Sequence, residues 1–292
     1  MPTQLKPSVT SPHKISVRWW KNAWNLKAPT HGTLFFFHGI GEHSGRYEEF
    51  ARYFSSWGFD VLSFDLPGHG LTARKGGYER FADFDEMRAE AKDVLRYWML
   101  EGPQASRELR AKPLYFMGHS LGSILCMYYL MSEEENEEFP FYPKRALANS
   151  LPVALQLKVP FWKEWIAKYL QKTVPDLKLG NEISKDELSH DVVKTYEYIQ
   201  DSWRMSKASP RLYISMKNTM EFVRSSYMDV QLPLMLISVA EDKIIDHTEL
   251  KNFYEHLNTH KKWIEFKGMR HETLNEIGRE KVYEEVVKWF LH

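Results

Sequence analysis

The sequence contains a single cysteine, Cys126, among 292 residues. One cysteine cannot form a disulfide within the chain, and it excludes metal sites built from several thiolates. Long apolar runs are also absent, since runs such as residues 114–117 and 232–237 have the length of a strand, whereas a membrane-spanning helix needs about 20 apolar residues. The first 20 residues lack the apolar segment of a signal peptide. We therefore expect a cytoplasmic protein without disulfides.

The sequence also lacks an excess of positive or negative charge. Lys and Arg total 39 and Asp and Glu also total 39, so no surplus of cations is available to neutralise a phosphate backbone. Nucleic acid is not an expected partner. Apolar residues make up 43% of the chain and charged residues 27%, which is the composition of a folded globular protein.

Short apolar runs alternate with helical patterns in the first half of the chain and again at its end. We expect strands at residues 34–37, 61–64, 114–117, 234–239 and 263–266, and helices at 47–57, 81–98, 123–130, 249–257 and 281–291. This alternation predicts an α/β fold with a mostly parallel central sheet flanked by helices. Residues 1–150 and 228–292 are expected to form it.

Residues 151–227 differ from the segments on either side, because they are helix-like and rich in aromatic residues. We predict a helical cap inserted over the sheet. Phe161, Trp162 and Trp165 begin an apolar stripe at helical spacing. The stripe is expected to pack on the body of the protein, and part of it is also a candidate to line a pocket for an acyl chain or to rest on lipid; the two interpretations are compatible. These three residues are our predicted substrate-binding residues.

A candidate nucleophile lies in residues 118–122, which read Gly-His-Ser-Leu-Gly between an expected strand and an expected helix. The pattern G-x-S-x-G in this context is typical of a serine held on a sharp turn. The glycines leave room for its strained backbone, and the N–H groups at the helix start can stabilise negative charge. An ordinary strand-to-helix turn is the alternative interpretation. We predict that Ser120 is the nucleophile.

An oxyanion hole needs two N–H donors, one from the residue after the nucleophile and one from the loop after an early strand. The run His-Gly-Ile-Gly-Glu-His-Ser-Gly-Arg-Tyr, residues 38–47, follows the first expected strand. We therefore predict the N–H groups of Ile40 and Leu121 as donors. The histidines of this part of the sequence lack metal-ligand spacing, so no metal is expected; they are His38, His43, His69 and His119.

The acid and the base should follow the nucleophile in the order Ser, Asp or Glu, His. Asp246 is three residues before Glu249 and is best explained as a helix N-cap, whereas Asp242 lies just beyond the expected strand 234–239. We predict Asp242 as the acid, with Glu241 as the alternative. His271, on the loop after the expected strand 263–266, is the predicted base.

These residues resemble the monoacylglycerol lipase and lysophospholipase family of serine hydrolases, which have the α/β-hydrolase fold. The matching stretches cover nearly the whole chain from residue 34 onward and are residues 38–47, 65–70, 118–122, 240–246 and 268–276, with a weaker match at 174–180. The resemblance implies a mobile cap, no cofactor and hydrolysis of one acyl ester of a glycerol lipid through an acyl-enzyme. It implies the same triad and oxyanion donors. The chain departs from many members at Ser123, where they have glycine.

The leading hypothesis is therefore a monoacylglycerol lipase whose substrate is a small lipid ester and whose cap is a candidate for peripheral membrane contact. A lysophospholipase is the first alternative. A short-chain esterase, a thioesterase or a peptidase on the same fold would prefer smaller or non-lipid substrates. A non-catalytic binding protein is the remaining alternative, and the complete set of Ser120, Asp242 and His271 argues against it.

Overall fold

The computed structural model describes residues 3–22, 30–102, 107–132, 141–156, 161–180 and 187–292. An eight-stranded sheet lies at its centre, in the order β1-β2-β4-β3-β5-β6-β9-β10. The six strands from β4 to β10 run parallel, and β1 and β2 are antiparallel at one edge. Their bounds are β1 Thr3–Pro7, β2 Lys14–Trp20, β3 Gly32–Phe37, β4 Phe59–Phe64, β5 Leu114–His119, β6 Arg145–Asn149, β9 Leu234–Val239 and β10 Lys261–Phe266.

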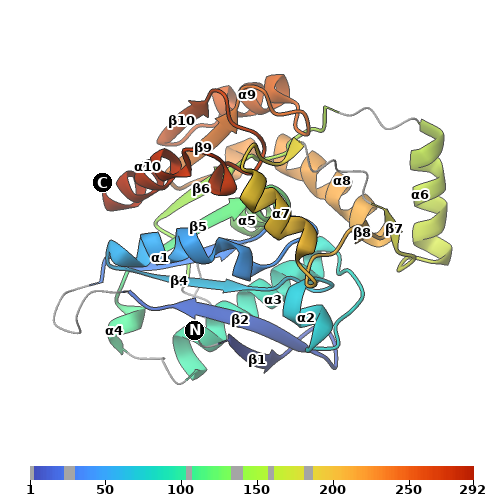
Figure 1. Cartoon of the computed structure of the whole chain (residues 1–292), viewed down its shortest axis with the longest axis horizontal. Coiled ribbons are helices and arrows are strands. Elements are labelled where there is room, and N and C mark those ends of the chain that lie inside the picture. The colour runs from blue at the N-terminus through green and yellow to red at the C-terminus, as the bar shows by residue number, and fades with distance from the viewer. Residues whose placement is uncertain (1–2, 23–29, 103–106, 133–140, 157–160, 181–186) are drawn as a thin grey trace.

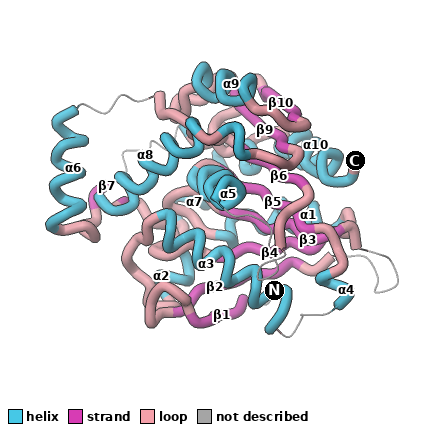
Figure 2. The backbone as a smooth tube through the Cα atoms, turned by 180° about the vertical axis from the view of Figure 1, so that it is seen from behind, coloured by secondary structure: helices cyan, strands magenta, loops and turns pink. Residues whose placement is uncertain are grey.

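The central strands are buried on both faces, and β3 shows how. Successive side chains point to opposite faces of a strand, so Leu34 and Phe36 pack in one apolar cluster while Phe35 and Phe37 pack in another. The first cluster includes residues of α1 (Glu48–Ser56) and α10 (Arg279–Leu291). The second includes residues of α3 (Phe84–Arg96), α5 (Leu121–Ser132), α8 (Pro210–Ser225) and α9 (His247–His256). Figures 1 and 2 show the two helical layers from opposite sides.

The segment between β6 and β9 contains helices and two very short strands. It comprises α6 (Phe161–Thr173), β7 (Leu179–Gly180), α7 (Val192–Gln200), β8 (Lys207–Ala208) and α8. The helix α8 packs on α5, and α6 packs on α8, so that α6 lies at the periphery of the molecule (Figure 1). The helices fall where the sequence predicts a cap. The division of the chain at residues 150 and 228 stays a prediction.

The remaining described elements are short. They are α2 (Gly70–Arg74), α4 (Arg107–Arg110), a π-helical turn at Tyr97–Glu101 and 3-10 turns at Ser44–Tyr47, Tyr227–Asp229 and Thr273–Asn275. Within the described residues, no helix has the length and apolar character required to cross a membrane.

The expected strands and helices are present, with ends displaced by a few residues. The sequence did not predict β1, β2 and β6, nor the two-residue strands β7 and β8. The sequence of β6 is Arg-Ala-Leu-Ala-Asn, in which leucine is the only large apolar residue, so no apolar run marks the strand. In β2 the buried positions include the polar residues Ser16 and Arg18, which interrupt the apolar pattern. The predicted N-cap is confirmed, because Asp246 Oδ1 accepts a hydrogen bond from the N–H of Glu249 at 3.1 Å.

We expect the Phe35→Ala variant to lose about 3–5 kcal/mol of unfolding free energy, which is typical when a buried phenylalanine leaves a cavity. Phe35 is fully buried, and its ring lies 4.7 to 5.7 Å from the rings of Phe37, Phe64 and Phe116. Urea denaturation measures the loss. Val193→Ala is the control, since its side chain is 65% exposed and should change the free energy by less than about 0.5 kcal/mol. Equal losses in the two variants would contradict this account of the core.

Candidate active site

Ser120 sits on the sharp turn between β5 and α5. Its φ is +51°, in the left-handed region that L residues rarely adopt. A Cβ atom at Gly118 would lie 2.2 Å from the carbonyl oxygen of Gly122, and one at Gly122 would lie 2.2 Å from that of Phe37. Only glycine fits these two positions. Gly118 allows the start of α5 to lie close to β5, and Gly122 allows it to lie close to β3.

The structure brings the predicted triad together. His271 Nε2 lies 2.8 Å from Ser120 Oγ, and His271 Nδ1 lies 2.7 Å from Asp242 Oδ2. The other carboxylate oxygen, Asp242 Oδ1, accepts a hydrogen bond from the N–H of Ile244 at 2.8 Å. Asp242 and His271 are buried, whereas Glu241, the alternative acid, is exposed. Three loops far apart in the sequence thus meet at the ends of the parallel strands.

The charges of the site favour a base oriented by an ionised acid. Burial alone would lower the pKa of His271, but the carboxylate of Asp242 outweighs burial and raises that pKa above 6.5. Burial opposes ionisation of Asp242 as well, yet His271 and the backbone N–H groups hold the pKa of this carboxyl below 3.8. His119 differs, since burial and the neighbouring His271 lower its pKa to about 3. His271 is therefore the histidine suited to accept a proton.

The predicted oxyanion loop lies beside the nucleophile. A Cβ atom at Gly39 would lie 3.4 Å from Ser120 Cβ, which places this backbone against the serine. Leu121 is the first residue of α5, so its N–H has no partner within the helix. The loop is held from the far side, because Gly41 accepts a hydrogen bond from the N–H of Met205 at 2.8 Å. The donor roles of Ile40 and Leu121 stay predictions.

A buried ion cluster that sequence reasoning missed connects the oxyanion loop to the base. Arg46 donates two hydrogen bonds to Glu272, at 3.0 and 2.8 Å, and a third to Glu42. Glu42 Oε1 accepts the N–H of Gly39 at 2.6 Å and the hydroxyl of Tyr47. The four-residue spacing of Glu42 and Arg46 was the available signal, but nothing in the sequence pairs Arg46 with a residue 226 positions away.

The pKa values of the two buried carboxyl groups, Glu272 and Glu42, shift in opposite directions. For Glu272, the desolvation that would raise its pKa is outweighed by the charge and hydrogen bonds of Arg46, which hold the pKa to about 2. For Glu42, burial prevails and raises the pKa above 4.5. Glu272 directly follows the candidate base, so the ion pair also fixes the backbone at His271.

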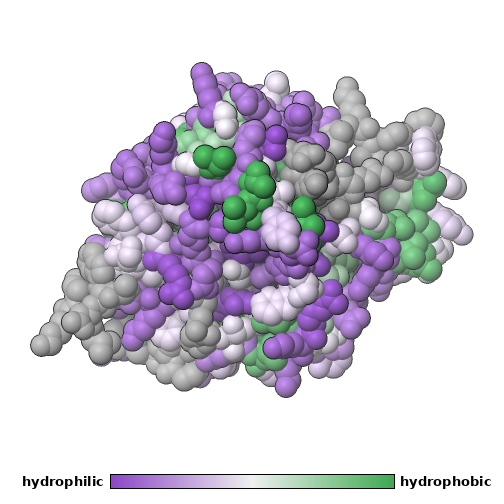
Figure 3. Space-filling model, viewed as in Figure 1, coloured by the Kyte–Doolittle hydropathy of each residue, from purple (hydrophilic) through white to green (hydrophobic). Residues whose placement is uncertain are grey.

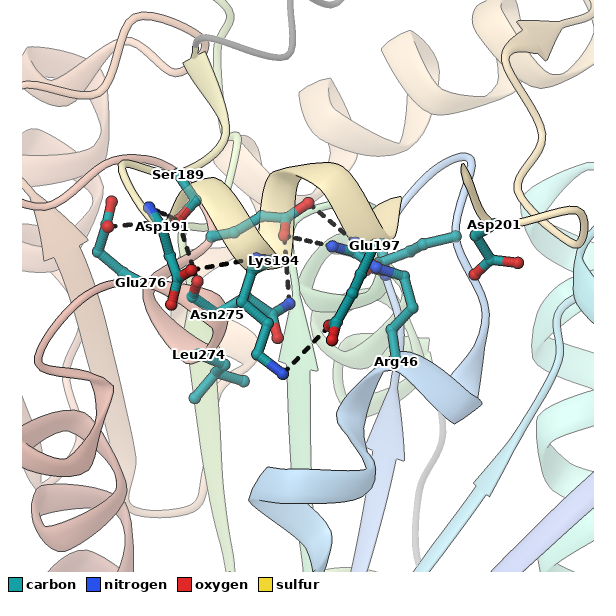
Figure 4. A network of polar contacts seen from close by, with 12 residues as sticks. Arg46, Ser189, Asp191, Lys194, Glu197, Asp201, Leu274, Asn275 and Glu276 are labelled. Carbon is teal, nitrogen blue, oxygen red and sulfur yellow. Dashed lines mark hydrogen bonds and ion pairs between the residues drawn. The ribbon is translucent and has the colours of Figure 1, made fainter. Parts of the chain in front are cut away.

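The N-terminal end of α7 is fastened to the loop that carries the base. The carboxylate of Glu276 accepts hydrogen bonds from Ser189 and from the N–H of His190, at 3.2 and 2.9 Å (Figure 4). Asp191, the N-cap of α7, binds Arg279 of α10 at 3.0 Å. These contacts attach the start of α7 to the segment that follows His271.

The predicted substrate-binding tryptophans lie on α6. Trp162 is 51% exposed and Trp165 is 70% exposed. The side chain of Phe161 lies outside the described residues. Among the charged and polar contacts of α6, Glu164 pairs with Lys217 of α8. A substrate-binding role for these residues stays a prediction.

The other histidines considered above have individual partners. His38 Nδ1 contacts the carbonyl oxygen of Gly39, His43 binds Asp201 at 2.6 Å, His69 Nδ1 contacts the carbonyl oxygen of Pro67, and His119 Nδ1 accepts from Asn149. Within the residues that the structure describes, no three His, Cys, Asp or Glu side chains form a group that could hold a metal ion. Ser123 donates its hydroxyl to the carbonyl oxygen of Ser120 at 2.6 Å.

Comparison with known proteins places this chain in a family. A family model described as serine aminopeptidase, S33, matches residues 28–278, and the chain belongs to this family of hydrolases. Phospholipase YtpA of Bacillus subtilis is 27% identical over 89% of this chain and 95% of its own length. Human monoglyceride lipase is 27% identical over 78% of this chain and 70% of its own length.

A solved structure supports the same family of folds as the sequence matches. The crystal structure of the monoacylglycerol lipase of Paleococcus ferrophilus is similar with a TM-score of 0.78 and 25% identity, over 94% of this chain and 98% of the other. A further relative in Dictyostelium discoideum, a protein with an abhydrolase domain, is 26% identical, and this chain spans 27% of its length. The α/β-hydrolase fold and the family resemblance expected from the sequence are confirmed.

We expect Arg46→Met to destabilise the fold by about 3–5 kcal/mol at pH 7, because it leaves two buried carboxylates without a countercharge. The pKa of Glu272 is about 2 in the folded protein, below its ordinary 4.5. Its contribution is therefore complete above pH 4.5 and declines as the pH falls toward 2. The difference between wild type and variant should shrink over this range, as denaturation at pH 7 and pH 3.5 would measure.

Arg52→Met is the matched control. The Arg52 side chain is 69% exposed and pairs with Glu48 at the surface, so its removal should change stability by less than about 1 kcal/mol. A loss of similar size for Arg46 and Arg52 would show that the buried cluster contributes no more than a surface pair.

Proposed function

We propose that the chain is a carboxylic-ester hydrolase that cleaves monoacylglycerols through an acyl-enzyme on Ser120. The observation that carries the proposal is the chain of hydrogen bonds from Ser120 through His271 to Asp242, at 2.8 and 2.7 Å. A serine, an imidazole and a buried carboxylate in this order form the arrangement that activates a hydroxyl for acyl transfer. Two of the similar proteins reported above are named monoglyceride or monoacylglycerol lipase, which supports the substrate.

Each residue has one task in the proposed reaction. Neutral His271 accepts the hydroxyl proton as Ser120 Oγ attacks the ester carbonyl carbon, and Asp242 holds the imidazole and stabilises its charged form. The N–H groups of Ile40 and Leu121 stabilise the oxyanion. The tetrahedral intermediate collapses, and His271 returns the proton to the leaving glycerol oxygen. Water then attacks the acyl-enzyme by the same route, which releases a fatty acid and restores the serine.

A lysophospholipase is the second candidate function. It is favoured by the similarity to the Bacillus subtilis protein named phospholipase YtpA, which extends over 95% of that protein. The triad serves either substrate, because both are glycerol esters with a single acyl chain. The two candidates differ in the headgroup, a neutral glycerol or a charged phosphate ester.

We expect wild-type protein to hydrolyse a long-chain monoacylglycerol faster than a lysophospholipid or a short-chain ester, and Ser120→Ala to be inactive on all three. Initial rates of fatty-acid release, with each substrate at equal concentration, provide the comparison. Ser123→Ala is the control, because it keeps both glycines of the turn and should stay active. A substitution at Gly118 cannot serve as a control, since that position has no room for a side chain.

The outcomes separate the candidates. A faster rate on the lysophospholipid would replace the first candidate with the second. Cleavage of the short ester alone would keep the triad and refute the lipid substrate. Full activity of Ser120→Ala would refute the mechanism.

The α6 helix supports a further part of the proposal, peripheral contact of the cap with a membrane. Its exposed apolar residues are Trp162, Trp165, Ile166 and Tyr169, and Lys168 and Lys172 are exposed on the same helix. Figure 3 shows hydrophobic side chains at the edge of the molecule that α6 forms. Tryptophan beside lysine is typical of helices that lie at a lipid surface. A cytoplasmic protein with such a helix could collect monoacylglycerol directly from the bilayer.

We expect Trp165→Asp to weaken partitioning onto phosphatidylcholine vesicles by about tenfold, because it replaces an apolar ring with a charge in the acyl boundary. Trp57→Asp is the matched control, since Trp57 is 43% exposed but lies at the end of α1 on the body of the protein. Vesicle co-sedimentation measures both. Equal partitioning of wild type and Trp165→Asp would refute contact through α6.

A further inference from the structure

Only two non-glycine residues in the described part of the chain have a left-handed backbone. They are Ser120, with φ +51°, and Ser150, with φ +50°. The conformation of Ser120 is explained by the turn that exposes its hydroxyl. Ser150 directly follows β6, which pairs with β5 in the sheet, so it lies next to the nucleophile. A strained backbone is common at functional sites, yet Ser150 takes no part in the proposed reaction.

Both polar groups of Ser150 bind catalytic segments. Its hydroxyl donates to the carbonyl oxygen of His271 at 2.9 Å, and its N–H donates to the carbonyl oxygen of Ile237 in β9 at 2.9 Å. The preceding residue extends the pattern, because the carbonyl oxygen of Asn149 accepts the N–H of Ser120 at 3.0 Å. The end of β6 therefore holds the backbone of the nucleophile, the base and the strand that leads to Asp242.

We propose that Ser150 is a positioning residue that fixes the backbone of His271 so that the imidazole meets Ser120 and Asp242 at once. Glycine is the residue that a φ of +50° favours. Compared with glycine, serine is strained in this conformation but provides one additional polar group, the hydroxyl. That hydroxyl donates to the backbone carbonyl oxygen of His271, the candidate base. Ser150 is fully buried, so no water competes for this hydrogen bond.

The proposal rests on the proposed function only in its use of His271 as the base. The carbonyl oxygen of His271 also accepts the N–H of Thr273 at 3.2 Å, and the Thr273 hydroxyl donates to Asn149 Oδ1 at 2.9 Å. The loop thus stays attached to β6 without Ser150. Loss of its hydroxyl should shift the ring without unfolding the loop.

The test compares Ser150→Gly and Ser150→Ala with wild type. Glycine relieves the strain and alanine keeps it, so the glycine variant should have the higher melting temperature of the two. Both lack the hydroxyl, and we expect both to lose about 10- to 100-fold in kcat on the best ester substrate, with KM unchanged, because small displacements of a reacting group have effects of this size. The rate of inactivation by a fluorophosphonate probe should fall in parallel.

Ser55→Ala is the matched control. Its buried hydroxyl donates to the carbonyl oxygen of Trp20 at 3.3 Å, which is the same kind of bond in a part of the fold that the proposed reaction does not use. This variant should keep kcat and the inactivation rate. A purely structural role of Ser150 would lower the melting temperature without changing either rate, so a Ser150→Gly variant with wild-type rates overturns the proposal.

Two further readouts keep the test independent of the substrate. The downfield proton resonance of the His271–Asp242 hydrogen bond should shift or broaden in Ser150→Gly, and the pH at which inactivation reaches half its maximum should move. If wild type reacts with the probe but cleaves no monoacylglycerol, the proposed function fails while the probe still decides the role of Ser150. If wild type does not react with the probe, an unchanged resonance in the variant overturns the proposal and a changed one supports it.

Discussion

The junction between β5 and α5 is the constraint on which the rest of the site depends. Ser120 must leave a fully buried strand in a left-handed conformation while a helix begins at the next residue. This is feasible only where the start of α5 approaches the end of β5 so closely that a side chain is excluded at Gly118, and approaches β3 so closely that one is excluded at Gly122. The same close approach sets the oxyanion loop, which continues from β3, against Ser120. Ser120 and the loop that carries Ile40 therefore depend on the same packing contact.

His271 and Asp242 reach this junction on longer loops, and buried polar groups hold those loops in place. Asp242 stays ionised because His271 and two backbone N–H groups face it. Arg46 binds Glu42 beside the oxyanion loop and Glu272 beside the base, so one cation fixes both sides of the site. Buried charge of this kind requires complete pairing, and the requirement makes the relative placement of the two loops nearly rigid.

The parallel strands expected from the sequence are present, because each carries the local signal of an apolar run. The cap and the triad are predictions that also rest on local signals, a helical stripe of aromatic residues and chemical groups directly after strands, and the structure brings Ser120, Asp242 and His271 together. The sequence did not predict β6, since Ala146 and Ala148 provide too little hydrophobic signal. Ser150 was missed with it. The partnership of Arg46 and Glu272 was also hidden, because only the fold brings together loops so distant in the chain. Local chemistry was readable, whereas the residues that orient it act through tertiary contacts.

The cap divides into two parts with different attachments. The segment around α7 binds the base loop through Leu188, whose carbonyl oxygen accepts the N–H of Glu272 at 2.8 Å, and the oxyanion loop through Met205, and Asp201 binds His43. The α6 helix packs on α8 instead. Substitutions in α7 should therefore disturb the arrangement of Ser120 and His271, whereas substitutions on the exposed side of α6 should leave that arrangement intact.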